Sequence, residues 1–384
     1  MKRILTMLMV VAMLIGVLAG CGSQTSVSAE SAMETSEAST TQAEASTPVT
    51  PEAVQEPASA AEEPASAAEE PESNLEEEAP YEAVDINIAA IKGPTGAGMV
   101  KLIDDAANGL TANNYNVELS ADASEVVTKV IAGEYDIACL PTNSAAVVYQ
   151  KTQGAVKLLA LNTEGVLHML QNTAAEEPIT DWEQLKGKTI YSLGQGANPE
   201  YVLDFVLSGH GIDPDNDVTI QFCAAADEVI AACASGEAAI CVLPEPAVST
   251  LSSKVEGFTE IFDMTEAWNE IVDDGSVLTQ GCVVVQSAFL EAHPEAVAKF
   301  LEEYEVSTDF VNGNNEEAAK LMAQYEIVPS EAIALKALPG CHIIFRAGQE
   351  MKESIQGYYE VLFQADPTSI GGALPDDDFY VIEP

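Results

Sequence analysis

The pattern of apolar and polar positions from about residue 85 onward predicts two consecutive series of strands and helices. In the first series, strands are expected at 85–91, 115–119 and 135–140, and helices at 99–108 and 124–132. In the second series, strands are expected at 189–193, 218–223 and 238–243, and helices at 200–208 and 227–235. Strands that alternate with helices of this length predict parallel sheets with helices on both faces.

The two series are copies of one another. A shift of 103 residues places 121–141 on 224–244 without a gap, and nine of these 21 positions are identical. The same shift places Gly93 on Gly196, each of which follows an apolar strand. The repeat therefore predicts two α/β lobes with the same topology.

The loops at the carboxyl ends of the strands are the expected ligand-binding segments, because open parallel sheets bind ligands there. These loops are 92–98 and 141–144 in one lobe and 195–198 and 244–247 in the other. If the lobes face each other, the four loops converge on one cleft.

The candidate ligand-binding residues place hydroxyls, amides and flexible backbone at the starts of helices, where free N–H groups and the helix dipole favour an anionic or polar group. The alternative is that these polar side chains only cap the helices. The candidates are Lys92, Gly93, Thr95, Gly96, Thr142, Asn143, Ser144, Gln195, Gly196, Asn198, Glu245 and Trp268.

Three of these candidates differ in character from the rest. Lys92 could pair with a sulfonate, carboxylate or phosphate, whereas Glu245 would suit an amino group or a pyrimidine. Trp268 either caps the ligand or packs in the protein interior. The identity of the ligand stays open on these residues alone.

The N-terminus has the features of an export signal. Lys2 and Arg3 precede an apolar run, 4–18, whose length of about 15 residues is short for a membrane span. The run ends at Leu18-Ala19-Gly20-Cys21, which resembles a bacterial lipobox in which the Cys21 thiol receives diacylglycerol. We expect residues 1–21 to be a lipoprotein signal peptide that ends at the lipidated Cys21.

Residues 22–84 are predicted to be a disordered acidic linker. They contain no Lys or Arg and almost no large apolar residues, so they cannot bury enough surface to offset the entropy of ordering. The whole chain has 62 Asp and Glu against 15 Lys and Arg, a net charge of −47. This charge argues against nucleic acid or an anionic membrane surface as partners.

The sequence offers no recognisable catalytic or metal-binding motif. None of the four histidines (His168, His210, His293 and His342) stands at a known spacing from a nucleophile or carboxylate, and His168 is expected to be a satisfied core residue. Six cysteines besides Cys21 lie in apolar contexts without a Cys-x-x-Cys pair; buried thiols are favoured, with disulfides as the alternative. We expect no enzyme activity, no metal and no cofactor.

Several segments resemble the type II periplasmic binding proteins of ABC importers. Residues 179–190, with Asp181-Trp182-Glu183-Gln184-Leu185-Lys186-Gly187-Lys188, resemble the opening of the second lobe in these proteins. Residues 133–137, 243–246 and 288–297 resemble the "G-x-x-D", "x-E-P" and "fl-ehPe-v" segments of the nitrate/sulfonate/thiamine-precursor branch. The similarity covers roughly 85–384, although 343–380 departs from the branch.

The resemblance implies an α/β fold of two lobes, each with a mainly parallel sheet flanked by helices, and a ligand cleft between the lobes. The chain would leave the first lobe near 168–175 and return near 273–283, so that the first lobe comprises 85–174 and 276–384 and the second 175–275. Helices at 288–304, 315–325, 329–337 and 347–364 would complete the first lobe.

The function implied by the resemblance is capture of a small polar organic or oxyanion solute for import. The expected partners are the solute and an ABC permease in the membrane, with the protein itself monomeric. The expected location is the extracytoplasmic face of the cell membrane, with the membrane contacted only through the lipid anchor. The alternatives are an extracytoplasmic enzyme or a ligand-sensing lipoprotein on the same fold.

Overall fold

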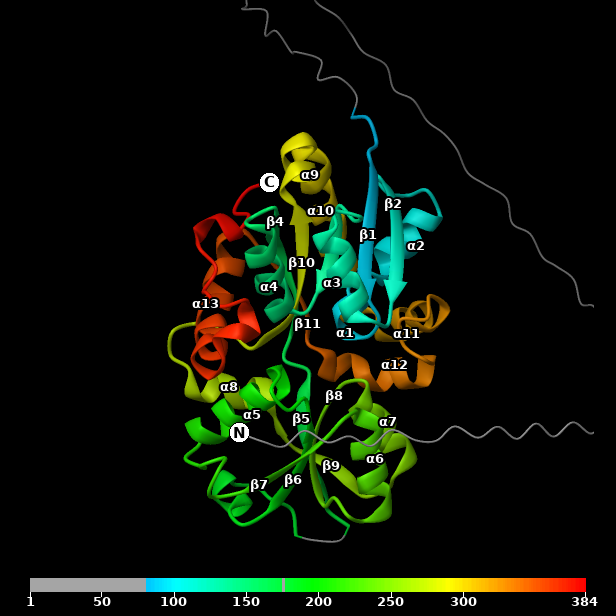
Figure 1. Cartoon of the computed structure of the whole chain (residues 1–384). Helices are drawn as coiled ribbons and strands as arrows, with labels where there is room; N and C mark the ends of the chain where they lie inside the picture. The colour runs from blue at the N-terminus through cyan, green and yellow to red at the C-terminus, as the bar shows by residue number, and fades with distance from the viewer. Residues whose placement is uncertain (1–80, 175–176) are drawn as a thin grey trace, which may run out of the picture. The chain divides into compact units, whose positions relative to one another are not determined.

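Two β-sheets organise the part of the chain that the computed structural model describes, residues 81–174 and 177–384 (Figure 1). These residues belong to one compact unit. The predicted signal peptide, Cys21 and nearly all of the predicted linker lie outside the described residues.

The first sheet contains both parallel and antiparallel strands. Strand β1 pairs in parallel with β2 and β3, and β10 runs antiparallel between β3 and β4. The sheet order is β11-β4-β10-β3-β1-β2, with the strands β1 (Asp85–Ile91), β2 (Asn114–Ser120), β3 (Ile137–Leu140), β4 (Val156–Glu164), β10 (Thr279–Gln286) and β11 (Ile343–Ala347).

The second sheet repeats this plan. Strand β6 pairs in parallel with β7 and β8, and β5 runs antiparallel between β8 and β9. The sheet order is β7-β6-β8-β5-β9, with the strands β5 (Leu167–Asn172), β6 (Thr189–Leu193), β7 (Thr219–Cys223), β8 (Ile240–Pro244) and β9 (Phe258–Asp263). The two-lobe α/β fold is confirmed, and its sheets are mixed where mainly parallel sheets were expected.

The sequence repeat is visible in the backbone. In both lobes the first strand of the repeat lies in the middle, flanked by the second and the third. The paired glycines Gly133 and Gly236 both have left-handed backbones, with φ of 74° and 79°, where the helix before the third strand ends. The matching strand order agrees with the two similar lobes that the repeat predicted.

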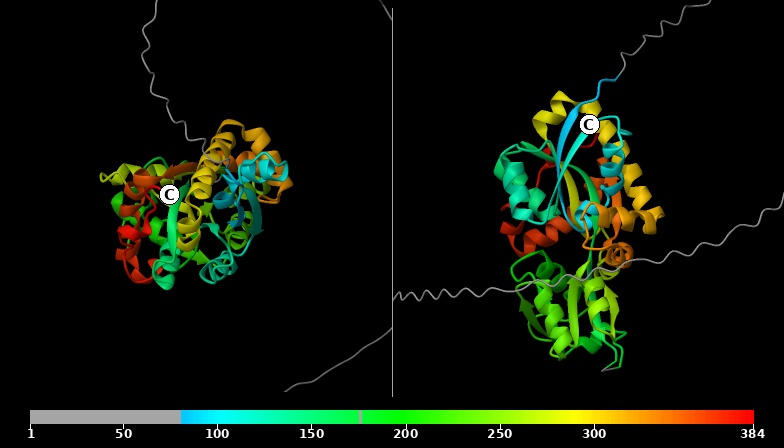
Figure 2. Two further views of the ribbon diagram at one scale, coloured as in Figure 1. Left: turned by 90° about the horizontal axis from the view of Figure 1, so that it is seen from above. Right: turned by 90° about the vertical axis from the view of Figure 1, so that its right-hand side faces the viewer.

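Helices cover both faces of the first sheet because apolar side chains alternate along its central strands. Ile86 and Ile88 point to one face, where helices α2 and α10 pack, and Ala89 points to the other, where α3, α4 and α13 pack. Figure 2 shows these helices on opposite sides of the sheet. The helices of this lobe are α1 (Pro94–Ala97), α2 (Val100–Ala107), α3 (Ala123–Ile131), α4 (Thr142–Thr152), α9 (Ser287–Ala292), α10 (Pro294–Gly313), α11 (Asn315–Gln324), α12 (Glu331–Ala337) and α13 (Gly348–Ala365), with the short 3-10 helices η2 (Leu338–Cys341), η3 (Pro367–Ile370) and η4 (Asp377–Phe379).

The second sheet is covered in the same way. Helices α6 and α7 pack on one face and α5 and α8 on the other. The helices of this lobe are η1 (Trp182–Leu185), α5 (Asn198–Gly209), α6 (Ala226–Ser235), α7 (Ala247–Lys254) and α8 (Met264–Ile271).

The chain crosses to the second lobe earlier than expected. Strand β4 ends at Glu164 in the first sheet, and β5 begins at Leu167 in the second, so the crossing lies at Gly165 and Val166, before 168–175. The expectation placed 167–172 in the first lobe because an apolar strand alone does not reveal which sheet it joins. The return crossing follows α8 and ends at β10, in the expected region.

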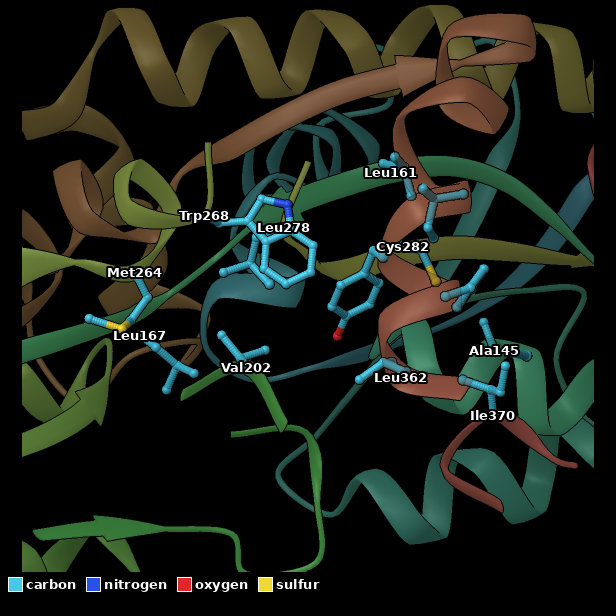
Figure 3. Close-up of a cluster of buried hydrophobic side chains, with 14 of the residues drawn as sticks. Ala145, Leu161, Leu167, Val202, Met264, Trp268, Leu278, Cys282, Leu362 and Ile370 are labelled. Carbon is cyan, nitrogen blue, oxygen red and sulfur yellow. The ribbon is translucent and has the colours of Figure 1, made fainter. Parts of the chain in front are cut away.

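The two lobes share one hydrophobic core around these crossings. Figure 3 shows Trp268 and Leu278 near its centre, both completely buried. The core continues into the second lobe through Leu167, Val202 and Met264, and into the first through Leu161, Cys282 and Leu362. The lobes are therefore joined by packing as well as by two chain connections.

The tight contact at Gly165 leads to a prediction. A Cβ atom at Gly165 would lie 2.4 Å from Oγ1 of Thr265, on α8, and 2.5 Å from Cδ2 of Leu278, on the return crossing, and both residues are buried. We expect Gly165→Ala to lower the free energy of unfolding by about 1–3 kcal/mol in urea denaturation, because the neighbours must shift. Gly313→Ala is the control, since its Cβ would meet nothing within 4 Å; equal effects of the two changes would contradict the close packing of the crossings.

A second prediction concerns acid stability. Burial, helped by Glu200 and Asp215, raises the pKa of Asp204 on α5 from 3.8 to about 6. The native state therefore disfavours the ionised carboxyl, and this cost is present above pH 6 and disappears as the pH falls below 3.8. We expect Asp204→Asn to stabilise the protein by about 1 kcal/mol at pH 7.5 and to have no effect below about pH 4.

The control for Asp204 is an aspartate with the opposite shift. The side chain of Asn216 and the N–H of Asp215 lower the pKa of Asp213, so Asp213→Asn should destabilise the protein at pH 7.5. Thermal denaturation across this pH range measures both variants. If Asp204→Asn lowered the free energy of unfolding at neutral pH, the ionised Asp204 carboxylate could not be destabilising the native state.

Candidate functional site

Polar side chains of both lobes meet around the hydroxyl of Tyr358, on α13. The Tyr358 hydroxyl donates to Oδ1 of Asn198, at the start of α5, with an O···O distance of 2.5 Å. The Thr142 side chain, at the start of α4, lies near enough to the Tyr358 hydroxyl to lower the pKa of Tyr358. Two of the predicted loops, one from each lobe, are thus brought together by a tyrosine that the sequence reasoning did not select.

Thr142 is held in place by two groups of its own lobe and by burial. Its hydroxyl donates to the carbonyl of Thr279 at 2.6 Å, its carbonyl accepts from the hydroxyl of Tyr359 at 2.9 Å, and its side chain is completely buried. Burial raises the pKa of Tyr358 well above its ordinary value, so its hydroxyl remains a donor at physiological pH. We call Thr142, Asn198, Thr279 and Tyr358 the Tyr358 cluster.

One buried polar group in this cluster and one beside it lack a hydrogen-bond partner among the described residues. They are the indole N–H of Trp268 and the hydroxyl of Thr279. The Trp268 ring packs at 4.4 Å from Phe205 and 5.8 Å from Tyr358, between ring centroids. Trp268 therefore packs in the core, one of the two roles expected, while its N–H stays available to an acceptor.

The predicted residues of the first-lobe loop 92–98 contact their own lobe. Lys92 forms an ion pair of 3.5 Å with the exposed Glu326, and the N–H of Gly93 donates to the carbonyl of Ile327. The carbonyl of Thr95 accepts from Asn162 at 2.9 Å. These contacts fix the loop, and a ligand-binding role for its residues stays a prediction.

Gly96 is confined by the backbone. A Cβ atom there would lie 2.5 Å from the carbonyl oxygen of Ile91, so glycine is required for the turn after β1. Its role is therefore explained by packing of the chain.

The remaining polar candidates differ in exposure. Gln195 and Gly196 are exposed, and the N–H of Gly196 donates to Glu200 within the first turn of α5. Asn143 and Ser144, in the first turn of α4, are half-buried. Ligand binding by these four residues stays a prediction.

Glu245 lies in a second polar group at the interface of the lobes. Its carboxylate accepts from the N–H of Ser249 at 3.1 Å and from the Ser249 hydroxyl at 3.0 Å. Burial raises the pKa of Glu245, while the two Ser249 hydrogen bonds and His168 oppose this rise. Ser249 and His168 therefore stabilise the charged carboxylate of Glu245, whereas its burial disfavours that charge.

His168 links the lobes beside Glu245. Its Nε2 donates to the carbonyl of Gly340, in the first lobe, at 2.9 Å, and its Nδ1 lies 2.9 Å from Oε2 of Glu260 and 3.4 Å from Oδ2 of Asp263. Burial opposes a charge on His168, but these partners outweigh it and raise its pKa to about 9. The expectation that His168 is a core residue with its hydrogen bonds made is correct for Nε2. It did not include the two carboxylates that lie near Nδ1.

His342 of the first lobe completes this group. Its Nε2 lies 3.4 Å from the same Oδ2 of Asp263, and its Nδ1 donates to the carbonyl of Gly165 at 2.5 Å. We call His168, Glu260, Asp263 and His342 the His168 cluster. No sequence spacing could have revealed it, since its members come from β5, β9 and the segment before β11.

The six cysteines of the body are free thiols. Five of them are buried and Cys223 is half-buried. The favoured prediction of buried thiols is therefore correct for five of the six cysteines.

The comparison with protein families identifies the chain. A model described as "ABC transporter, phosphonate, periplasmic substrate-binding protein" matches residues 102–334, well over half of the 384 residues. The chain belongs to this family. The predicted kinship with ABC-transporter substrate-binding proteins is confirmed.

Relatives of known structure share the fold. The crystal structure of an ABC transporter from Parabacteroides distasonis superposes with a TM-score of 0.65 at 21% identity, over 77% of this chain and 98% of that one. The periplasmic aliphatic sulphonate binding protein SsuA from Escherichia coli superposes with a TM-score of 0.60 at 12% identity, over 76% of this chain and 92% of SsuA.

A curated relative covers a shorter segment. The binding protein YtlA from Bacillus subtilis (strain 168) is 28% identical over 148 residues, which cover 36% of this chain and 42% of YtlA. The match thus spans less than half of that relative. Within residues 81–174 and 177–384, no helix has both the length and the apolar character of a membrane span.

The bridge between Tyr358 and Asn198 can be tested by a double-mutant cycle. Tyr358→Phe should lower the free energy of unfolding by about 1 kcal/mol, and the loss should be smaller in an Asn198→Ala background because the acceptor is already gone. Urea denaturation of the four proteins gives the coupling.

The control cycle pairs Asn198→Ala with Tyr325→Phe, whose hydroxyl donates to Asp104 within the first lobe. These two changes should be additive within about 0.5 kcal/mol. Additivity of the Tyr358 and Asn198 changes as well would contradict a direct bridge.

Proposed function

We propose that this protein captures a small organic anion between its two lobes and presents it to an ABC permease for import. The proposal follows from the family and from the polar groups at the interface of the lobes. A phosphonate is the first solute class to consider, because the family description names it. Sulfonates come next, because SsuA is described as a sulphonate-binding protein.

The observation that supports this proposal most strongly is the Tyr358 cluster. Its hydroxyl and amide groups come from both lobes, so one solute could contact both at once. The chain has a net charge of −47, and an anion must therefore be held by local donors against an unfavourable overall field.

The start of α4 offers such donors. Thr142, Asn143 and Ser144 form its first turn, where the backbone N–H groups lack acceptors within the helix. The helix dipole adds a partial positive charge at this end. These groups suit the oxygen atoms of a phosphonate or sulfonate.

The unpartnered donors nearby support the same placement. A buried N–H or O–H without an acceptor costs about 1–3 kcal/mol. An oxygen atom of a bound solute would satisfy the indole N–H of Trp268 or the hydroxyl of Thr279. Contact of Glu245 with an amino group of the solute remains a separate prediction.

Movement of the lobes would control access to the solute. The lobes are joined by two crossings, and closure about such connections is a common way to bury a ligand and form a new surface. A closed, solute-bound form is the species that a permease would recognise. The protein therefore acts by binding, without catalysing a reaction.

We also propose that the protein is a lipoprotein held at the extracytoplasmic face of the cell membrane. The lipobox-like Leu18-Ala19-Gly20-Cys21 and the acidic linker support this proposal. A diacylglyceryl group on Cys21 would attach the chain, and the linker would hold a monomeric binding domain away from the bilayer. Such an arrangement keeps the solute site accessible.

Titration calorimetry with phosphonates, sulfonates, nitrate, amino acids and thiamine precursors tests the proposed function. We expect saturable binding of a member of the first two classes at one site per chain. Thr142→Val and Asn198→Ala should each weaken it by about 1–3 kcal/mol, a factor of roughly 5 to 150, because each removes a hydrogen-bonding group.

Thr128→Val is a matched control for Thr142→Val, since the Thr128 hydroxyl donates to the carbonyl of Ser124 on the exposed surface of α3. It should bind the solute normally. Normal binding by both cluster variants would contradict the proposed site, and failure of all solutes to bind would contradict the function.

Fluorescence gives an independent reading of the site. The chain has two tryptophans, and Trp182 stacks between His210 and Phe262 in the second lobe. The Trp182→Phe protein retains Trp268 as its single tryptophan, and we expect its emission to shift on solute binding. An unchanged emission under conditions where calorimetry shows saturation would place the solute away from Trp268.

A further inference from the structure

We propose that the His168 cluster is a binding site for a divalent transition-metal cation. The residues are His168, Glu260 and Asp263 of the second lobe, with His342 of the first lobe as a fourth ligand. This site is separate from the Tyr358 cluster and does not depend on the proposed solute. It also revises the expectation that the protein binds no metal.

The spacing of the donor atoms fits a metal ion. One ligand atom each of His168, Glu260 and Asp263 lies within 4.8 Å of the others. Two donors at 2.0–2.1 Å from a tetrahedral ion are about 3.4 Å apart. The Oδ2 atom of Asp263 lies 3.4 Å from Nδ1 of His168 and 3.4 Å from Nε2 of His342.

Both imidazoles are oriented as metal ligands usually are. Nε2 of His168 faces the carbonyl of Gly340, and Nδ1 of His342 faces the carbonyl of Gly165. A carbonyl only accepts, so these nitrogens carry the protons. In metal sites the second nitrogen of a histidine typically donates to a carbonyl in this way, which turns the free nitrogen toward the ion.

The carboxylate of Asp263 is positioned in the same manner. Its Oδ1 accepts from the N–H groups of Thr265 and Glu266 at the start of α8. Its Oδ2 is thereby left to face the two histidines. The first turn of the helix thus fixes the orientation of this ligand.

The buried Nδ1 of His168 is the second observation that points to a cation. The side chain is 2% exposed, and Nδ1 makes no well-directed hydrogen bond within the described residues although Glu260 lies 2.9 Å away. At this distance the nitrogen and the carboxylate oxygen attract each other only when a positive charge, either a proton or a metal ion, lies between them. A metal ion would satisfy Nδ1 and both carboxylates together.

The backbone at His342 is consistent with a functional position. Its φ of 43° lies in the left-handed region, which non-glycine residues rarely adopt. Such conformations gather at ligand-binding sites. Since His342 belongs to the first lobe, a bound ion would join the two lobes.

The donor set defines the class of ion. Two imidazole nitrogens and two carboxylate oxygens suit Zn²⁺, Co²⁺, Mn²⁺ or Fe²⁺ better than Ca²⁺, which prefers oxygen ligands alone. The cluster contains no thiolate, so a Co²⁺ complex should show nitrogen and oxygen coordination without sulfur charge-transfer bands.

The test is calorimetric titration of chelator-stripped, solute-free protein with Zn²⁺, together with absorption spectra of the Co²⁺ complex. We expect one Zn²⁺ per chain. Glu260→Gln should weaken binding at least tenfold and should fold normally, because the Glu260 side chain is 47% exposed. His342→Gln should also weaken binding, and it should remove one nitrogen ligand from the Co²⁺ spectrum.

The matched control is Glu256→Gln, which removes the same charge from an exposed position four residues away. It should leave Zn²⁺ affinity unchanged. Equal affinity in the Glu256→Gln and Glu260→Gln proteins would overturn the proposal, as would wild-type protein that binds no Zn²⁺. Either result would make His168 a protonated partner of its carboxylates only, and neither would affect solute binding at the Tyr358 cluster.

Discussion

The structure depends on the apolar packing that joins the two lobes at their crossings. Trp268 and Leu278 are completely buried where the chain passes between the sheets, and Gly165 leaves room for Leu278 to approach the opposite crossing. This packing limits how the lobes can move, because a large separation would expose the shared core to water. The polar groups at the interface are thereby held in register by apolar contacts.

The repeat places equivalent positions of the two lobes in different chemical surroundings. The shift of 103 residues pairs Thr142, at the start of α4, with Glu245, just before α7. Thr142 lies beside the hydroxyls of Tyr358 and Tyr359, whereas Glu245 lies beside Ser249 and His168. Equivalent positions of the repeat therefore have different polar neighbours at the interface of the lobes.

The sequence predicted the strands of the repeat well because their signals are local. The expected strands 85–91 and 189–193 coincide with β1 and β6, and the helices of the repeat lie within two residues of their expected bounds. The single helix expected at 288–304 was wrong, because Pro294 starts a new helix: α9 ends at Ala292 and α10 continues to Gly313. Strand β5 was expected in the first lobe but belongs to the second sheet, and only Gly165 and Val166 separate it from β4. Periodicity reports burial of a strand and gives no information about its neighbours.

The candidate site was predictable only in part. Helix starts and strand ends pointed to Thr142 and Asn198, which the structure joins through Tyr358. Tyr358 itself, like His342, stands far along the chain from its partners, and nothing in the local sequence marks it. The most direct test of the account is a crystal structure with the bound solute. We predict that the solute contacts the start of α4 and Asn198 together, and a solute held entirely within one lobe would contradict the account.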